Sequence, residues 1–209
     1  MLGMFVILDG LDGCGKSTQA ELLVAALGSS RAFAGRPLHL REPGSTEVGE
    51  RVRELLLDRG LTLSAEVETL LFCAARRQML DELVQPALDA GRDVICERFH
   101  PSTFAYQGVA GDLDPDRVLA LLTEWANRPS PDLIVLFDLD VSEALVRRGA
   151  ARDRIEDKGA KYLARVAEGY RLFASRHPRA RVIDAGRDVS LVARDVFAAV
   201  EAARRGEWE

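Results

Sequence analysis

One short segment near the N-terminus constrains the fold of this chain more than any other. Residues 10–17 match the pattern G-x-x-x-x-G-K-[ST] at every fixed position. The apolar run 5–8 precedes this segment, and a helical pattern over 17–27 follows it. A glycine-rich turn between a strand and a helix points backbone N–H groups and the positive helix end at phosphate oxygens. The segment therefore predicts a loop that binds the phosphates of a nucleoside triphosphate such as ATP.

The residues of this loop have separate expected tasks. Lys16 should reach the β- and γ-phosphates and assist catalysis, and the Ser17 hydroxyl should bind Mg²⁺. Cys14 stands at a variable position, and we interpret it as a tolerated small residue rather than a redox switch. The residues expected to contact ATP are Gly10, Leu11, Asp12, Gly13, Cys14, Gly15, Lys16, Ser17 and Thr18.

Short apolar runs alternate with helical patterns along the whole chain. Such runs are typical of strands that are covered on both faces, and strand–helix alternation indicates a parallel sheet between two layers of helices. We therefore expect one three-layer α/β/α domain over residues 1–209, with a central five-stranded parallel sheet. The predicted strands are 5–8, 38–40, 94–96, 133–137 and 181–183.

Several residues predict where helices begin and end. Gly28 is a suitable left-handed residue after the first helix. Ser64, Asp114 and Asp140 are expected N-caps, and Glu143 has capping-box spacing from Asp140. Two helices carry apolar stripes, and the pattern leaves open which stripes face the core and which face a second subunit. The first stripe is Val48, Val52, Leu55 and Leu56; the second, expected to be buried, is Val67, Leu70, Leu71 and Ala74.

Composition excludes several other classes of protein. The 209 residues are 47% apolar, yet charges interrupt every hydrophobic run before it reaches the length of a membrane span. The formal charge of −5 argues against a nucleic-acid-binding protein. The N-terminus lacks the pattern of a signal peptide, and three cysteines without metal-ligand spacing suggest free thiols. We therefore expect a cytoplasmic protein that binds neither membranes nor nucleic acid.

Five segments, in this order and at these separations, resemble thymidylate kinases. The likeness extends from the first strand to about residue 185. It implies a P-loop kinase fold with a short lid, and a homodimer. It also implies Mg²⁺-dependent transfer of the γ-phosphoryl group of ATP to dTMP, giving ADP and dTDP for dTTP synthesis. The segments are 8–13 (LDGLDG), 41–44 (REPG), 72–78 (FCAARRQ), 97–108 (ERFHPSTFAYQG) and 153–156 (DRIE).

Two arginines follow predicted strands. Arg41 comes after the second strand and Arg98 after the third. Because the carboxyl ends of parallel strands open onto the ligand crevice, we expect both to hold the phosphate of the acceptor, with Arg98 also catalytic. Surface ion pairs are the alternative interpretation.

The resemblance also assigns a nucleotide site on the acceptor side. Phe72 and Arg76 are four residues apart on a predicted helix and so share a face. In the family, the aromatic stacks on thymine and the arginine bonds a base oxygen. Asp12 matches the residue at the deoxyribose 3′-hydroxyl. The stretch that lines the base and sugar corresponds to Ser102, Thr103, Tyr106 and Gln107, with Tyr106 disfavouring a ribonucleotide.

Two positions depart from the family pattern. Glu97-Arg98 replaces the usual Asp-Arg, and we expect Glu97 to serve the magnesium shell with Ser17 and Asp9. His100-Pro101 is unlike many members, and we expect His100 to be a loop residue without a catalytic role.

The position of the catalytic charge distinguishes two varieties of the family. Some members carry an arginine inside the phosphate loop, where this chain has Gly13, and the others carry arginines in a lid. The resemblance therefore implies the lid-arginine variety, with a lid over about 147–158. We select Arg148 and Arg152 as catalytic residues; solvated helix charges are the alternative.

Two other functions remain open at this point. One is a kinase for another nucleoside monophosphate or for a deoxynucleoside, which the Phe72/Arg76 pair and Tyr106-Gln107 disfavour. The other is a nucleotide-binding switch without catalysis, which the combination of Lys16 and Arg98 disfavours.

Overall fold

The computed structural model describes residues 3–29, 35–150 and 154–207, and its centre is one parallel sheet. The strand order is β2-β3-β1-β4-β5. All five predicted strands are confirmed, and each is one or two residues longer than predicted. The strands are β1 (Phe5–Gly10), β2 (Leu38–Arg41), β3 (Val94–Glu97), β4 (Leu133–Asp138) and β5 (Ala180–Asp184).

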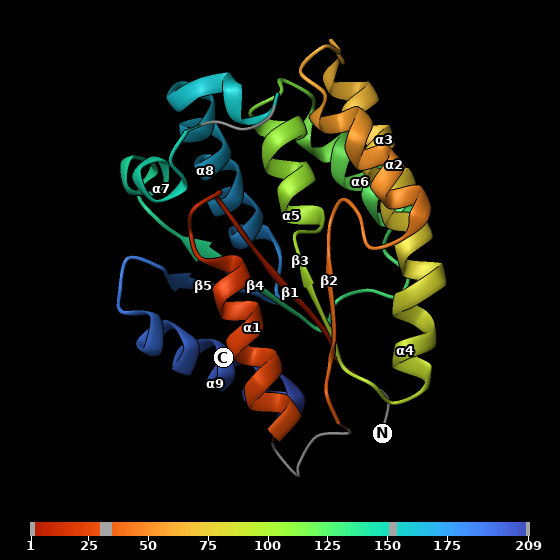
Figure 1. Ribbon diagram of the computed structural model, residues 1–209, viewed down its shortest axis with the longest axis vertical. Coiled ribbons are helices and arrows are strands. Elements are labelled where there is room, and N and C mark those ends of the chain that lie inside the picture. The colour runs from red at the N-terminus through yellow and green to blue at the C-terminus, as the bar shows by residue number, and fades with distance from the viewer. Residues whose placement is uncertain (1–2, 30–34, 151–153, 208–209) are drawn as a thin grey trace.

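Helices cover both faces of this sheet (Figure 1), which confirms the predicted three-layer architecture. On one face lie α1 (Lys16–Ser29) and α9 (Val189–Arg205), which pack against each other. The remaining helices are α2 (Glu47–Leu57), α3 (Ala65–Met79), α4 (Gln85–Asp89), α5 (His100–Thr103), α6 (Pro115–Trp125), α7 (Val141–Arg148) and α8 (Gly159–Arg176). Three shorter helical segments are the π-helical η1 (Leu80–Val84) and η2 (Phe104–Val109) and the 3₁₀ turn η3 (Glu156–Lys158).

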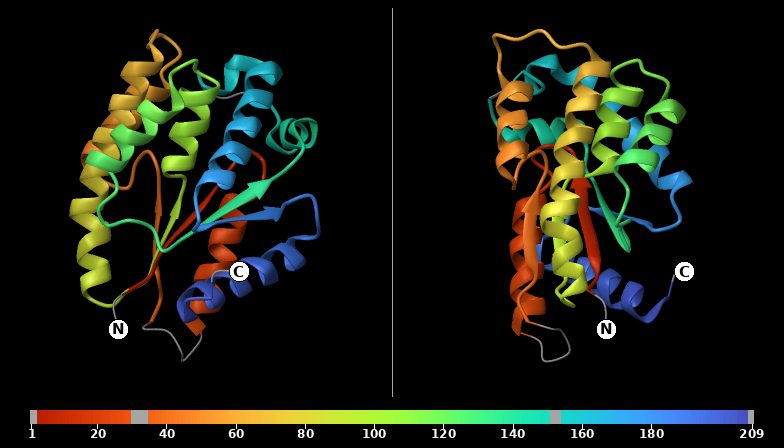
Figure 2. Two further views of the ribbon diagram at one scale, coloured as in Figure 1. Left: turned by 180° about the vertical axis from the view of Figure 1, so that it is seen from behind. Right: turned by 90° about the vertical axis from the view of Figure 1, so that its right-hand side faces the viewer.

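The π-helical segments join neighbouring helices instead of ending them. α3 continues through η1 into α4, and α5 continues into η2. Figure 2 shows the first of these as one long rod beside the sheet. No helix of the described residues combines the length and the apolar content that crossing a bilayer requires.

The register of the sheet brings the expected functional residues to one edge. β1 lies in the centre and is buried throughout, and Leu8 pairs with Glu97 of β3. Arg41 of β2 in turn pairs with Glu97. The carboxyl ends of β1, β2 and β3 therefore meet, in the upper half of the molecule in Figure 1, and the loops that follow them share one crevice.

Most of the predicted helix boundaries are confirmed. Ser64, Asp114 and Asp140 each cap a helix by accepting a hydrogen bond from a backbone N–H. The capping box is only half formed, because Glu143 contacts Arg147. The prediction for Gly28 is wrong. This glycine lies inside α1, which continues to Ser29, and its Cα faces the backbone of Arg36.

The second apolar stripe does not face the core. Val67 and Leu70 are 42% and 57% exposed, so the prediction that this stripe is buried is wrong for the single chain. The buried side of α3 instead carries polar groups, among them Glu68 and Arg76. Of the first stripe, on α2, only Leu56 is fully buried. α3 thus turns polar side chains inward and apolar ones outward, which hydrophobic periodicity alone cannot distinguish from the usual arrangement.

Candidate active site

The phosphate loop is shaped by its backbone. Gly10, Gly13 and Gly15 have φ angles of +147°, +89° and +92°, which residues with a side chain rarely adopt. Lys16 folds over the loop, and its Nζ donates to the carbonyl oxygens of Gly10 and Leu11 at 3.0 and 2.9 Å. Its ammonium is therefore already positioned where the motif places the phosphates.

A carboxylate lies beside the hydroxyl of this loop. Ser17 Oγ donates to Glu97 Oε2 at 2.5 Å, and Glu97 Oε1 lies 2.9 Å from His39 Nε2. A hydroxyl and a carboxylate are the hard oxygen ligands that Mg²⁺ prefers. Ser17 and Glu97 therefore fit the predicted metal ion.

Asp9 has a different task from the one predicted. It is fully buried, and its carboxylate accepts hydrogen bonds of 2.8–3.0 Å from the backbone N–H groups of Gly10, Phe99 and Ser102. The hydroxyls of Ser102 and Tyr170 add bonds of 2.7 and 2.8 Å. Because five donors occupy its two oxygens, Asp9 has no lone pair left for the metal ion that was predicted to bind it. The carboxylate instead anchors the segment after β3 to the end of β1.

Arg98 is held in a strained conformation at the start of that segment. Its φ is +68°, and its N–H donates to the Leu8 carbonyl at 3.0 Å. The guanidinium pairs with Asp12, donates to Ser102 Oγ at 2.9 Å and lies 5.5 Å from the centre of the Tyr106 ring. Burial alone would raise the pKa of Asp12, but the charges of Arg98 and Lys16 outweigh burial and hold that pKa below its usual value.

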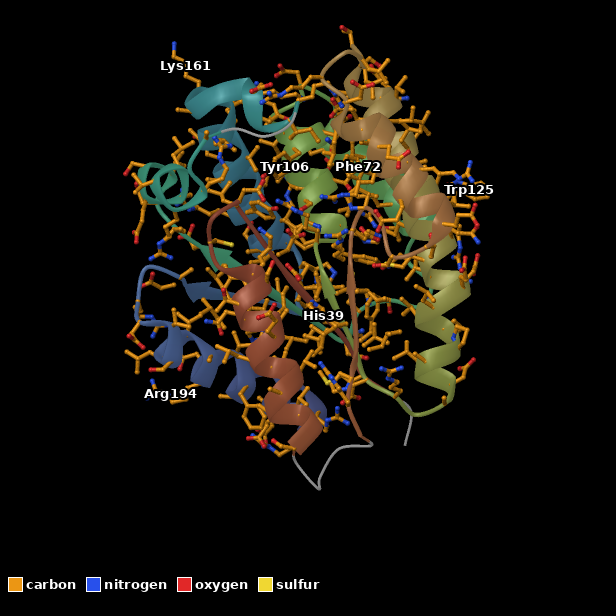
Figure 3. The ribbon with its side chains drawn as sticks, in the orientation of Figure 1. His39, Phe72, Tyr106, Trp125, Lys161 and Arg194 are labelled. Atoms are coloured by element: carbon orange, nitrogen blue, oxygen red, sulfur yellow. The ribbon has the colours of Figure 1, made fainter. Side chains whose placement is uncertain are left out.

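A cavity of about 170 Å³ opens between these residues and α3. Figure 3 shows two of its walls, Phe72 and Tyr106, in the upper half of the molecule. Eight of the nine residues predicted for the acceptor line this cavity. They are Asp12, Phe72, Arg76, Arg98, Ser102, Thr103, Tyr106 and Gln107.

The floor of the cavity is a buried ion pair. Arg76 Nε lies 3.0 and 2.8 Å from the two oxygens of Glu42, and its Nη2 donates to Thr103 Oγ1 at 3.1 Å. Burial raises the pKa of Glu42 to about 7, and the charge of Arg76 opposes that rise. Arg76 Nη1 is buried without a hydrogen-bond partner in the described part of the chain. A buried donor without a partner is rare, and Arg76 is one of the residues that line the cavity.

A second cavity, of about 400 Å³, adjoins the first at the phosphate loop. Arg41, the ninth predicted residue, lines this one; its side chain is 60% exposed and lies 3.7 Å from Glu50. Lys16 and Ser17 line it as well. Asp12 and Arg98 line both cavities, so the two sites are continuous.

Comparison with known proteins decides the family. A profile described as thymidylate kinase matches residues 8–196. A thymidylate kinase of Pelotomaculum thermopropionicum is 41% identical over 96% of this chain and 94% of its own length. Another, of Caldanaerobacter subterraneus subsp. tengcongensis, is 39% identical over 99% of both chains.

The chain belongs to the thymidylate kinase family.

A solved thymidylate kinase has the same fold. The crystal structure of the enzyme from Ehrlichia chaffeensis superposes with a TM-score of 0.77 at 29% identity, over 96% of this chain and 99% of that one. The predicted P-loop kinase fold and the membership of an enzyme family of nucleoside monophosphate kinases are thereby confirmed.

The expected lid region is described in part. Arg148 ends α7, and its Nε and Nη1 are buried without a hydrogen-bond partner in the described residues. α7 lies against the phosphate loop, because a Cβ added to Gly13 would come 2.4 Å from the Ala144 carbonyl oxygen. The other selected arginine, Arg152, lies outside the described residues.

Sequence reasoning missed four residues of this site. Glu42 lay inside a recognised motif, but only its neighbour Arg41 received a role. Arg53 lines both cavities, and Tyr170 bonds Asp9 from α8. Glu68 contacts Gln107 at 2.8 Å. The helical spacing of four between Glu68 and Phe72 was the available signal, since it places both on neighbouring parts of one helix face.

His100 is not a loop residue. It begins α5, is buried, and lies against the ring of Phe99 with centroids 4.2 Å apart. Its Nε2 is 2.7 Å from the Ala126 carbonyl oxygen and therefore carries the proton. Burial, together with the charge of Arg76, holds the pKa of His100 well below its usual value. The expectation that it has no catalytic role stays a prediction.

Proposed function

We propose that this chain transfers the γ-phosphoryl group of ATP to dTMP, giving ADP and dTDP, across the two adjoining cavities. The observation that carries the proposal is their continuity at Asp12 and Arg98. ATP occupies the phosphate loop, and dTMP occupies the cavity lined by Phe72 and Tyr106. The family membership supports this choice of substrates.

The side chains of the acceptor cavity match each part of dTMP in this proposal. Arg76 Nη1 donates to a base oxygen, and Phe72 stacks on the base. Tyr106 and Asp12, 3.4 Å apart, meet the sugar. Arg98 and Arg41 hold the phosphate and screen its repulsion from ATP.

Catalysis is electrostatic in this proposal. The phosphate oxygen of dTMP is already anionic, so the reaction requires positioning and charge neutralisation rather than a strong base. Lys16, Arg98 and the lid arginines Arg148 and Arg152 supply positive charge to the transferred group. When Mg²⁺ is bound by Ser17 and Glu97, it neutralises further charge on the ATP phosphates.

Two observations favour lid arginines over a loop arginine. Position 13 has no room for a side chain, since α7 lies against it. The buried, unpartnered Nε and Nη1 of Arg148 offer donors at the start of the lid. These nitrogens are the kind of group that a phosphate oxygen satisfies.

The outward stripes of α2 and α3 support the expected homodimer. Val48 and Leu55 on α2 and Val67 and Leu70 on α3 are exposed, and Trp125 extends from the neighbouring α6 at the edge of the molecule (Figure 3). An exposed apolar surface over packed helices is typical of an interface between subunits. Leu70→Glu should therefore shift the chain from dimer to monomer in sedimentation analysis, whereas Leu22→Glu on α1 should not. A monomeric wild type would contradict the dimer.

The state of the three cysteines supports the proposal that the protein is cytoplasmic. All three are buried free thiols, as expected where the surroundings are reducing.

An ADP-release assay across a panel of acceptors tests the main proposal. With ATP, the chain should turn over dTMP faster than dUMP, dCMP, dGMP or thymidine. Preference for another acceptor would indicate a kinase of different specificity. ATP binding without turnover of any acceptor would indicate a nucleotide-binding switch and refute the proposal.

A further inference from the structure

Glu68 is a buried carboxylate that connects two parts of the acceptor site without lining the cavity itself. It lies on α3, and its Oε2 accepts from Gln107 Nε2 at 2.8 Å. Its Oε1 accepts from Arg154 Nη1 at 2.6 Å and from Lys158 Nζ at 3.3 Å. One oxygen thus serves the acceptor segment, and the other serves the end of the lid.

The two cations keep this carboxylate ionised. Burial raises the pKa of Glu68, but the hydrogen bonds from Gln107 and Arg154 and the charge of Lys158 outweigh burial and lower it. Arg154 is itself fixed by a second bond, 2.9 Å from its Nη2 to the Leu56 carbonyl oxygen. An ionised carboxylate accepts hydrogen bonds and cannot donate them.

This property determines which way the Gln107 amide points. Its NH₂ group must face Glu68, because the reverse orientation would bring two acceptor oxygens together. Gln107 is almost completely buried and lines the acceptor cavity. With its nitrogen held by Glu68, its oxygen is the atom left for a ligand in that cavity.

We propose that Glu68 is a positioning residue that holds the Gln107 amide oxygen toward the acceptor base and thereby favours thymine over cytosine. The inference rests on the proposed placement of the base in this cavity. Thymine carries a hydrogen on N3 and an oxygen on C4, so it can donate to Gln107 and accept from Arg76 Nη1. Cytosine presents an acceptor at N3 and a donor at C4, and therefore opposes both groups.

The segment 154–158 takes part in this selection through Glu68. Arg154 and Lys158 supply the charges that hold the carboxylate ionised, and the adjacent Ile155 lines the cavity. Base selection therefore depends on this segment being in place, although neither cation lines the cavity.

Glu68→Gln is the direct test, because it preserves shape but introduces a group that can donate. The Gln107 amide can then turn over and present its NH₂ to the base. We expect kcat/KM for dTMP to fall about tenfold or more, mainly through KM, and the ratio of dTMP to dCMP turnover to fall by at least as much. Glu66→Gln, an exposed neighbour on α3, is the matched control and should change neither value.

Glu68→Asp keeps an acceptor-only side chain and should retain the preference for dTMP even if KM rises. An unchanged dTMP-to-dCMP ratio in a folded Glu68→Gln variant would overturn the proposal and leave Glu68 a purely structural role. If that variant does not fold, Gln107→Leu takes its place. The proposal requires Gln107→Leu to lower kcat/KM for dTMP but not for dCMP, and an equal loss for both would overturn it. A wild type that fails to phosphorylate dTMP would instead refute the proposed function.

Discussion

The phosphate loop and the acceptor cavity share Asp12 and Arg98, yet they are built in different ways. The loop is one continuous segment. Its shape comes from glycine backbone angles and from two hydrogen bonds that Lys16 donates to the carbonyl oxygens of Gly10 and Leu11. The cavity is assembled from side chains on α2, α3, α5 and η2 and on the loops after β1, β2 and β3, and its floor is a buried ion pair between residues 34 positions apart. The loop is local and made of backbone, whereas the cavity is long-range and made of side chains.

This difference has a consequence for mutation. In the loop, most side chains can change while the backbone keeps its shape. In the cavity, removing one partner leaves another polar group buried and unsatisfied, which costs more than the lost contact. Changes in the cavity should therefore reduce stability as well as activity, and changes in the loop should reduce mainly activity.

The largest expected effect is on stability, at the floor of the cavity. Glu42→Leu leaves the Arg76 guanidinium buried without its carboxylate, which should lower the free energy of unfolding by about 3–5 kcal/mol. Urea denaturation at pH 8 measures the change. The double variant Glu42→Leu/Arg76→Met should recover much of the loss, because it removes the unpaired charge. Equal stabilities of the single variant and the wild type would show that the cavity is not held by this pair.

Lys16→Met should show the opposite behaviour. The ammonium at the phosphates is lost, and kcat should fall by about 10²–10³-fold. The unfolding midpoint should change little, since the contacts of the Lys16 ammonium are with residues of its own loop: two carbonyl oxygens, Cys14 and Asp12. Steady-state kinetics and a thermal melt on the same sample measure both. A large loss of stability would remove the distinction between the two regions.

Arg98 belongs to both regions and should show an intermediate effect. Arg98→Ala removes charge-assisted contacts, and kcat/KM should fall at least tenfold, since such a contact contributes about 1.5–3 kcal/mol. Arg98→Lys should keep the positive charge but lose the forked geometry, so its kcat/KM should lie between those of the wild type and Arg98→Ala. If kcat/KM is unaltered in Arg98→Ala, Arg98 does not contact the reacting groups.

The smallest expected effect is the pH dependence of stability behind the cavity. The pKa of His100 is lower in the folded state than in the unfolded state, so below about pH 6.5 the unfolded chain binds a proton that the folded chain excludes. His100 alone should therefore lower the stability as the pH drops from 7.5 to 5, by up to about 1.4 kcal/mol per pH unit. Glu42, whose pKa burial raises to about 7, contributes in the opposite direction over this range.

His100→Gln isolates this contribution, because its amide can still donate to the Ala126 carbonyl. As the pH drops from 7.5 to 5, its stability relative to the wild type should therefore increase. His177, whose pKa is also lowered, is the comparison; it is half-buried, so His177→Gln should change the slope less. Parallel curves for wild type and His100→Gln would show that His100 is not kept neutral.

What could be predicted from the sequence follows the same division. The loop and the five strands were predictable because their signals are local: a fixed glycine spacing and short apolar runs. Nine residues were predicted for the acceptor, and eight line one cavity because a family resemblance supplied contacts that spacing cannot. Their ligand contacts remain predictions.

The predictions that failed concern contacts between residues far apart in the sequence, or which face of a helix is buried. No local pattern reveals that Asp9 bonds Tyr170, 161 residues away, or that Glu42 lies beneath Arg76. The stripe of α3 has the spacing of a buried face, but the buried face is the polar one that carries Glu68 and Arg76. Periodicity identifies an apolar side of a helix and cannot say what covers it.

The absent side chain of Gly13 also governs how the molecule can move. α7 lies so close to the phosphate loop that backbone meets backbone, and the two therefore form one mechanical unit. The glycine directly after α7, Gly149, has a φ of +78°, and a Cβ there would meet nothing within 4 Å. The chain thus leaves this unit at Gly149. Arg148 ends α7 directly before that glycine, so in the proposed function its charge is preset beside the nucleotide.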